Sequence, residues 1–165
     1  MPDTAAMRLL IRSVRLGPRL CRLALVCALV AASGCASGPP LLRGAITVDP
    51  TTNPDISGRP SPIVVRVYEL KSLGAFNGAD FFSLFEKEQE VLGGELVGRE
   101  EFHLRPAENR PYQRQLQPDT KFIGVVAAFR DLEGSLWRQA VPVPVQRRAT
   151  VTIGLERQAV KVVVK

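Results

Sequence analysis

The chain has 165 residues, a length that fits one domain with a leader and leaves little room for a second large domain. Its 22 Lys and Arg against 16 Asp and Glu give a formal net charge of +6, but residues 1–34 hold five of these basic residues and one of the acids. The remaining 17 basic and 15 acidic side chains give a net charge of only +2, and the basic residues are scattered singly along the sequence apart from Arg147-Arg148, which disfavours nucleic-acid binding.

The N-terminal stretch is typical of a secretory signal peptide. Five arginines are spread between Arg8 and Arg22, and the stretch from Leu23 to Ala32 is apolar and uncharged. This apolar run is much shorter than the roughly 20 residues that cross a bilayer. We therefore expect residues 1–34 to be a cleaved signal peptide and not a permanent membrane span.

The signal ends in Ala-Ser-Gly-Cys at residues 32–35, which resembles a bacterial lipobox, although Ala32 stands where the motif prefers Leu. Because the other two cysteines lie in the leader, Cys35 is the lone cysteine of the expected mature chain, and a secreted protein has few uses for a lone thiol. We predict acylation of Cys35, with palmitate as a lipid. Ala36 follows, and by resemblance to enteric-type lipoproteins the lack of Asp there favours the outer membrane. The alternative is an ordinary signal peptide that leaves Cys35 as a free thiol.

The segment after the signal contains Ser-Gly-Pro-Pro at residues 37–40, so we expect residues 35–42 to be the lipidated cysteine and a tether. A single domain at 43–165 would follow. This part of the chain is mainly β by its apolar alternation. Eight strands are expected, at Ala45–Asp49, Ile63–Leu70, Leu96–Leu104, Arg110–Leu116, Phe122–Arg130, Leu136–Val145, Ala149–Leu155 and Val160–Val164. Close turn signals between so many short strands predict a two-sheet β-sandwich.

Three strand features predict positions within the sheets. Phe122–Arg130 is apolar on both faces, which is typical of a central strand. Asp131–Gly134 has the residues of a hairpin turn. Pro142 and Pro144 both lack an amide donor and lie on the same side of their strand, so we expect this strand to be an edge.

One segment has helical spacing instead. Its apolar residues between Asp80 and Leu92 recur at a helical period, with Asp80 as the expected N-cap and Gly93-Gly94 as the expected end. We expect one helix inserted between two strands. The aromatic residues Phe76, Phe81, Phe82 and Phe85 are expected to attach this helix to the sheet.

No residue set points to catalysis, to a metal or to a cofactor. The chain has one histidine, His103, which alternates with apolar neighbours on an expected strand and should point outward. Metal sites need several ligands at fixed spacing, and acyl-transfer chemistry needs a nucleophile beside a base. Glu100-Glu101 would point to opposite faces of a strand, and no phosphate-binding glycine loop is present. We therefore expect a binding protein and not an enzyme.

The stretch between the first two expected strands, Asp49–Pro62, is long for a sandwich connection. The three prolines of its part Asn53–Pro62 reduce the conformational entropy that is lost when the stretch docks. A partner-binding loop and a merely structural crossover fit these residues about equally well.

This stretch and the segments after it resemble the TssJ family, the outer-membrane lipoproteins of bacterial type VI secretion systems. The residues that carry the resemblance are Asn53–Asp55, Gly58–Ser72, Phe76, Ala79–Phe85, Leu92-Gly93, Gly124–Asp131 and Trp137-Arg138. The resemblance implies a transthyretin-like β-sandwich with one added helix, anchored in the periplasmic face of the outer membrane. It implies a scaffold that binds the periplasmic region of TssM, which forms the envelope-spanning base with TssL.

In the family the loop between the first two strands makes this contact. The resemblance therefore gives Asn53, Pro54, Asp55, Ile56, Arg59 and Pro60 as the candidate partner-binding residues. Two alternatives stay open at this point, namely a transthyretin-like carrier of a small molecule and a periplasmic hydrolase that uses a carboxylate pair.

Overall fold

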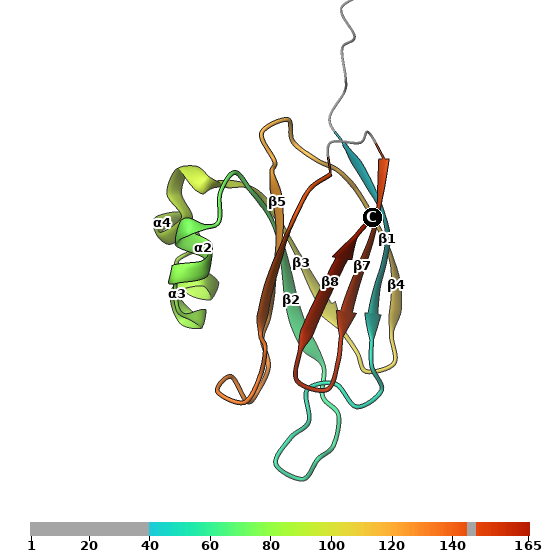
Figure 1. Cartoon of the computed structure of the whole chain (residues 1–165). Helices are drawn as coiled ribbons and strands as arrows, with labels where there is room; N and C mark the ends of the chain where they lie inside the picture. Colours follow the sequence, from blue (N-terminus) through green and yellow to red (C-terminus); the bar gives the residue numbers. More distant parts are fainter. Residues whose placement is uncertain (1–39, 145–147) are drawn as a thin grey trace, which may run out of the picture. The chain divides into compact units, whose positions relative to one another are not determined.

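A computed structural model describes residues 40–144 and 148–165 of the chain. The expected signal peptide (1–34), the lipidation site Cys35 and most of the expected tether (35–42) lie outside the described residues. The domain is a β-sandwich of eight strands in two four-stranded sheets, as predicted (Figure 1).

The first sheet has the strand order β4-β1-β7-β8 and the second the order β3-β2-β5-β6. The strands are β1 (Leu41–Val48), β2 (Ile63–Leu70), β3 (Leu96–Leu104), β4 (Asn109–Gln115), β5 (Phe122–Ala127), β6 (Arg138–Pro142), β7 (Arg148–Leu155) and β8 (Val160–Val164). All neighbouring strands pair antiparallel except β1 and β7, which run parallel.

Strand β1 begins four residues before the expected start at Ala45, so Leu41 and Leu42 belong to the sheet and not to the tether. Leu42 is fully buried and begins the alternation that continues through Ile46. Gly44 is required in this strand because a Cβ there would lie 1.6 Å from the backbone oxygen of Val151 on β7. The sequence suggested a linker at this point because glycine and proline precede the first clearly alternating residues.

The core lies between the two sheets and consists of the inward-facing residues of alternating strands. On β7 every second residue from Ala149 to Leu155 is buried, as expected for a strand with one face on the core. Strand β5 lies between β2 and β6 and is buried along most of its length. The prediction of a central position for this segment is confirmed, because Val125 faces the core while Val126 faces the helices on the other side.

A polar link joins the sheets within this core. Glu69 on β2 is 2% exposed, and its carboxylate accepts hydrogen bonds from Arg114 on β4 (2.8 Å), from the backbone of Gln117 (2.7 Å) and from the hydroxyl of Thr120 (2.7 Å). A buried carboxylate with this many donors is satisfied where it lies. Glu69 is therefore a structural residue.

The helical insertion between β2 and β3 consists of three short helices, where the sequence predicted one. They are α2 (Gly74–Gly78), α3 (Phe81–Glu86) and α4 (Glu88–Leu92), and a 3₁₀ turn (Gly93–Glu95) follows. Asp80 is the N-cap of α3, as predicted, and accepts hydrogen bonds from the backbone (3.0 Å) and hydroxyl (2.6 Å) of Ser83. Gly93, with a φ of 47°, is the C-cap of α4.

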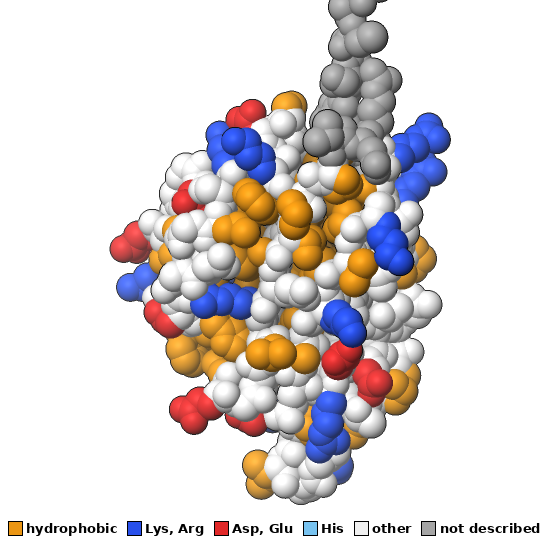
Figure 2. Space-filling model, in the orientation of Figure 1, with side chains coloured by type: hydrophobic (Ala, Val, Ile, Leu, Met, Phe, Trp, Pro, Cys, Tyr) orange, Lys and Arg blue, Asp and Glu red, His pale blue; other side chains and the backbone are white. Residues whose placement is uncertain are grey.

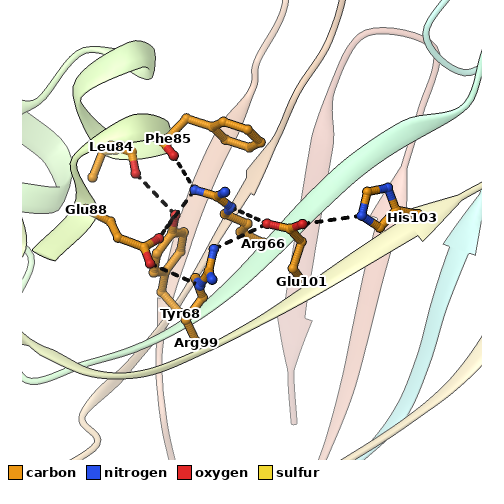
Figure 3. A network of polar contacts seen from close by, with 8 residues as sticks. All are labelled: Arg66, Tyr68, Leu84, Phe85, Glu88, Arg99, Glu101 and His103. Atoms are coloured by element: carbon orange, nitrogen blue, oxygen red, sulfur yellow. Dashed lines mark hydrogen bonds and ion pairs between the residues drawn. The ribbon is translucent and has the colours of Figure 1, made fainter.

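A polar network explains the break between α3 and α4 (Figure 3). Arg66 on β2 donates to the backbone oxygen of Phe85, and the hydroxyl of Tyr68 donates to that of Leu84 (3.3 Å). These bonds satisfy carbonyls at the end of α3, where a helix leaves acceptors without an intrahelical partner. Burial raises the pKa of Tyr68 to about 12, so this hydroxyl keeps its proton at neutral pH.

The same arginine belongs to an ion-pair network that we call the helix clamp, formed by Arg66, Tyr68, Glu88, Arg99 and Glu101. Arg66 pairs with Glu101 on β3 at 2.7 Å and with Glu88 on α4 at 3.4 Å. Arg99 pairs with Glu88 at 3.1 Å and with Glu101 at 3.2 Å. The helix clamp therefore attaches the helical insertion to two strands of the second sheet (Figure 3).

Aromatic side chains attach the insertion in parallel with the helix clamp. Phe76 is fully buried and contacts Tyr68 edge to face, at 5.9 Å between ring centroids. Phe81 stacks on Phe85 at 5.1 Å, and both pack against buried residues between the helices and the second sheet, among them Val126. The prediction that this aromatic group holds the helices on the sheet is confirmed for these three residues. It is wrong for Phe82, which is 60% exposed.

Strand β6 is an edge of the second sheet, as its prolines predicted. The amide of Val143 donates to Lys121 on the β5 side, so the positions of Pro142 and Pro144 face away from β5. Just before β6, Leu136 forms an isolated parallel bridge with Ala159, which precedes β8. The two sheets thus approach each other at this side.

Candidate partner-binding site

Four connections meet at one end of the sandwich, opposite the first residue of β1 (Figure 1). They are the β1–β2 loop (49–62), the β3–β4 turn (105–108), the β5–β6 hairpin (128–137) and the β7–β8 turn (156–159). The register explains this, because Val48 pairs with Leu155, and Ile63 pairs with Leu104. The β1–β2 loop projects farthest in the view of Figure 1.

The base of the loop is anchored in the sandwich by two buried residues. Thr52 is fully buried, and its hydroxyl donates to the backbone oxygen of Leu155 at 2.8 Å. Asn53 is 3% exposed and has a φ of 54°, a left-handed conformation that Asn tolerates better than most residues.

Asn53 bonds to three separate segments. Its backbone N–H donates to the oxygen of Arg157 (2.9 Å), its side-chain N–H₂ donates to the oxygen of Pro62 (2.8 Å), and its side-chain oxygen accepts from the N–H of Arg130 (2.8 Å). The β1–β2 loop, the β5–β6 hairpin and the β7–β8 turn are therefore held together through this one residue.

The tip of the loop is a compact turn built around Asp55. Its carboxylate accepts from the backbone N–H of Ser57 (2.8 Å) and of Arg59 (2.9 Å) and from the Arg59 guanidinium (2.8 Å). The hydrogen bond from the Arg59 backbone is the largest of the effects that hold the pKa of Asp55 below its usual value. Gly58 takes a φ of +76°, which the tight reversal requires. The loop is thus ordered by its own hydrogen bonds.

The six predicted partner-binding residues have different exposures. Ile56 is fully exposed at the tip, Arg59 and Pro60 are also exposed, and Pro54 and Asp55 are half-buried. Asn53 is buried. Figure 2 shows a hydrophobic side chain near Lys or Arg side chains at the lower end, where the loop projects. A fully exposed isoleucine on an ordered turn is the kind of apolar anchor that a protein partner buries.

Beside the loop lies an open groove of about 710 Å³, which we call the loop groove. One wall is formed by Pro54, Asp55 and Ile56 of the loop, and the other by Arg130, Asp131, Arg157 and Gln158 of the two hairpins. The sequence predicted a turn at Asp131, and Arg157 and Gln158 lie between its last two predicted strands. It placed Arg130 at the end of the predicted strand Phe122–Arg130. It did not predict that these four residues lie beside the loop, because this depends on the pairing of β1 with β7 and of β2 with β5.

Within residues 40–144 and 148–165, no group of three or more His, Cys, Asp and Glu side chains could hold a metal ion. His103 is exposed on β3, as predicted, and its Nε2 lies 3.3 Å from the carboxylate of Glu101. Glu101 is itself bonded to Arg66, so His103 lies next to the helix clamp. The described helices include none that is long and apolar enough to span a membrane.

Three solved structures have a similar fold and match this chain over about three quarters of its length. The crystal structure of the T6SS lipoprotein TssJ1 from Pseudomonas aeruginosa is 41% identical, with a TM-score of 0.74, and the match covers 77% of this chain and 97% of that chain. Serratia marcescens Lip, titled a membrane-bound component of the type VI secretion system, is 29% identical over 77% of this chain and 98% of its own, with a TM-score of 0.66. A chain of a structure titled "Type VI membrane complex" is 25% identical over 76% and 98%, with a TM-score of 0.68.

The comparison with curated proteins found no match. A protein-family model described as type VI secretion lipoprotein, VasD, EvfM, TssJ, VC_A0113 matches residues 41–158, which include strands β1 to β7. The resemblance of the sequence is thereby confirmed. Because this model spans most of the chain and the Pseudomonas protein is similar along nearly its whole length, the chain belongs to the TssJ family of type VI secretion lipoproteins.

Proposed function

We propose that this lipoprotein of the type VI secretion system is a scaffold that binds the periplasmic region of TssM, and through TssM is connected to TssL. In this proposal Cys35 carries the acyl chains that hold the protein on the periplasmic face of the outer membrane, and no reaction is catalysed. Membership in the TssJ family and the likeness to a chain of a type VI membrane complex support a role in that assembly.

The observation that carries the proposal is the ordered loop with Ile56 exposed at its tip. The turn around Asp55 and the anchoring at Asn53 fix the loop before any partner arrives. Binding through a preformed loop loses less conformational entropy than binding through a flexible one. An exposed apolar side chain on such a loop contributes to affinity because it leaves water on docking.

The position of the loop suits an anchored protein. Strand β1 has eight residues and therefore spans about 25 Å. Leu41, from which the chain continues back toward Cys35, is at one end of this strand, and the loop begins at Asp49, just beyond the other end. A loop at that end would face the periplasm when the start of β1 is held near a membrane.

The geometry divides the candidate residues into two roles. Ile56, Arg59 and Pro60 are exposed and are proposed to touch TssM directly, with Pro54 and Asp55 at the rim of the contact. Asn53 is proposed to act by holding the loop in place, because its side chain is almost fully engaged within the domain.

Binding of residues 36–165 to the purified periplasmic region of TssM from the same organism tests the proposal. In one variant a Gly-Ser linker replaces residues 54–60 and leaves Asn53 intact, and in another Ile56 is changed to Glu. We expect the linker variant to lose measurable binding and Ile56→Glu to weaken it at least tenfold, about 1.4 kcal/mol.

The matched control is Phe82→Glu, which changes another exposed apolar residue on α3, away from the loop. It should leave the dissociation constant unchanged. If the unchanged domain does not bind TssM, the proposed function is wrong. If it binds but both loop variants bind equally well, the contact lies elsewhere on the domain.

A further inference from the structure

The loop groove contains two arginines that come from different hairpins. Arg130 precedes the turn of the β5–β6 hairpin, and Arg157 lies in the β7–β8 turn. Both residues are exposed, and neither side chain forms an ion pair with any residue in the described part of the chain. An arginine offers five donors in a planar fork, a geometry that matches a carboxylate.

The acidic residues of the same groove are already engaged. Asp55 is paired with Arg59 and accepts two backbone N–H groups. Asp131 accepts from the backbone of Gly134 (2.9 Å) and from the side chain of Gln158 (2.9 Å). Local hydrogen bonds therefore hold both carboxylates. The positive charge of Arg130 also contributes to the lowered pKa of Asp55, but within the described part of the chain neither Arg130 nor Arg157 donates a side-chain hydrogen bond.

The two arginines are held at a defined place relative to the loop. Asn53 accepts from the backbone N–H of Arg130 and donates to the backbone oxygen of Arg157. The backbones that carry both side chains are thus fixed to the residue that also anchors the loop. This gives the groove a preformed shape, with an apolar side at Pro54 and Ile56 and a basic side at Arg130 and Arg157.

We propose that the loop groove is a second part of the docking surface and that it takes an acidic side chain of the partner next to an apolar one. Arg130 and Arg157 bind the carboxylate, and Ile56 covers the neighbouring apolar side chain. This inference rests on the proposed function, since the partner is the periplasmic region of TssM. The basic side of the loop groove adds specificity, because charge complementarity across an interface selects the partner and fixes how the two surfaces align.

The test measures the dissociation constant for the TssM periplasmic region at low and high salt, using residues 36–165 with Arg130→Glu and Arg157→Glu combined. We expect at least a tenfold loss of affinity at low salt, and a smaller difference from the unchanged domain at high salt because salt screens exposed charges. A neutral pair, Arg130→Gln with Arg157→Gln, should lie between the two. If a lowered melting temperature shows that the charge-reversed variant folds poorly, the neutral variant replaces it in the test.

The matched control reverses two exposed basic residues near the other end of the sandwich, Arg43→Glu and Lys121→Glu. It changes the net charge equally and should bind like the unchanged domain. If the unchanged domain binds and the loop replacement abolishes binding, but the arginine variants match this control, the groove inference is overturned while the proposed function stands. Failure of the unchanged domain to bind overturns both.

Discussion

Asn53 shows how one buried side chain sets the geometry of an exposed surface. The sequence marked it as a contact residue because it lies in the long loop, but the structure buries it and engages both ends of its amide. Sequence position could not distinguish the two roles. The distinction depends on the β5–β6 hairpin and the β7–β8 turn lying beside the loop, which is a matter of strand pairing.

Substitution of Asn53 should lower the stability of the domain. Asn53→Gly keeps the left-handed backbone but leaves the N–H of Arg130 and the oxygen of Pro62 without their partner, so we expect a loss of about 1–3 kcal/mol. Asn53→Ala should lose about 1 kcal/mol more, because a Cβ disfavours a φ of 54°. Urea unfolding measures both.

Asn109→Ala, at an exposed position at the start of β4, is the control and should change stability by no more than about 0.5 kcal/mol. Equal stability of Asn53→Gly and the unchanged domain would show that the amide does not hold the loop.

Arg130 and Arg157 mark the limit of what the sequence predicted about the site. The mature basic residues are scattered along the chain, and this scatter served only to disfavour nucleic-acid binding. Arg157 comes to lie beside the loop because β1 pairs in parallel with β7, a strand more than 100 residues later, and Arg130 because β2 pairs with β5. No local pattern contains that information.

At the scale of elements, strands were predicted better than helices. The bounds of β2 and β3 coincide with those expected from their alternation, because the period of two follows directly from one face lying on the core. The segment from Asp80 to Leu92 has a helical period as well, yet it breaks at Lys87. Arg66 and Tyr68 of the helix clamp, both on β2, bond to carbonyls at that break.

The helix clamp should make attachment of the helical insertion depend on pH. The hydrogen bond from Arg66 is the largest of the effects that lower the pKa of Glu101 in the folded protein. The ionised Glu101 carboxylate therefore stabilises the fold at pH values above the pKa of about 4.3 that it has in the unfolded chain. This stabilisation is lost as the pH falls through the lower pKa of Glu101 in the folded protein. Because Glu101 is 31% exposed, we expect the effect to be at most about 1 kcal/mol.

Trp137, the single tryptophan of the chain, can report this change because its ring contacts Phe81 of α3 edge to face at 5.4 Å. We expect its emission to shift to longer wavelength between pH 5 and pH 3, and Glu101→Gln to show a smaller change over that range. Arg66→Met should already show at pH 7 the longer emission wavelength that the unchanged domain shows at pH 3. Lys161→Met, which removes the exposed pair with Glu156, is the control and should behave like the unchanged domain.

At the scale of the whole domain, the topology separates the start of the fold from the candidate site. Strand β1 is paired along its length with β4 on one side and β7 on the other. Its first and last residues therefore lie at opposite ends of the sandwich. The eight strands and the two-sheet class could be predicted from alternation and turns. The order of the strands could not, since it depends on contacts between segments far apart in the chain.

This separation predicts that membrane attachment and partner recognition are independent properties. Several acyl chains on one cysteine give lasting anchorage, because each buried methylene contributes about 0.8 kcal/mol. If Cys35 carries the anchor, as proposed, we expect the Cys35→Ala variant to leave the membrane fraction of fractionated cells. The purified variant should bind the TssM periplasmic region with a dissociation constant within about twofold of that of the detergent-solubilised lipoprotein, because the loop and the groove are unchanged. Weaker binding by the variant would mean that the acyl chains or the residues next to them take part in recognition, and retention in the membrane fraction would mean that Cys35 is not the anchor.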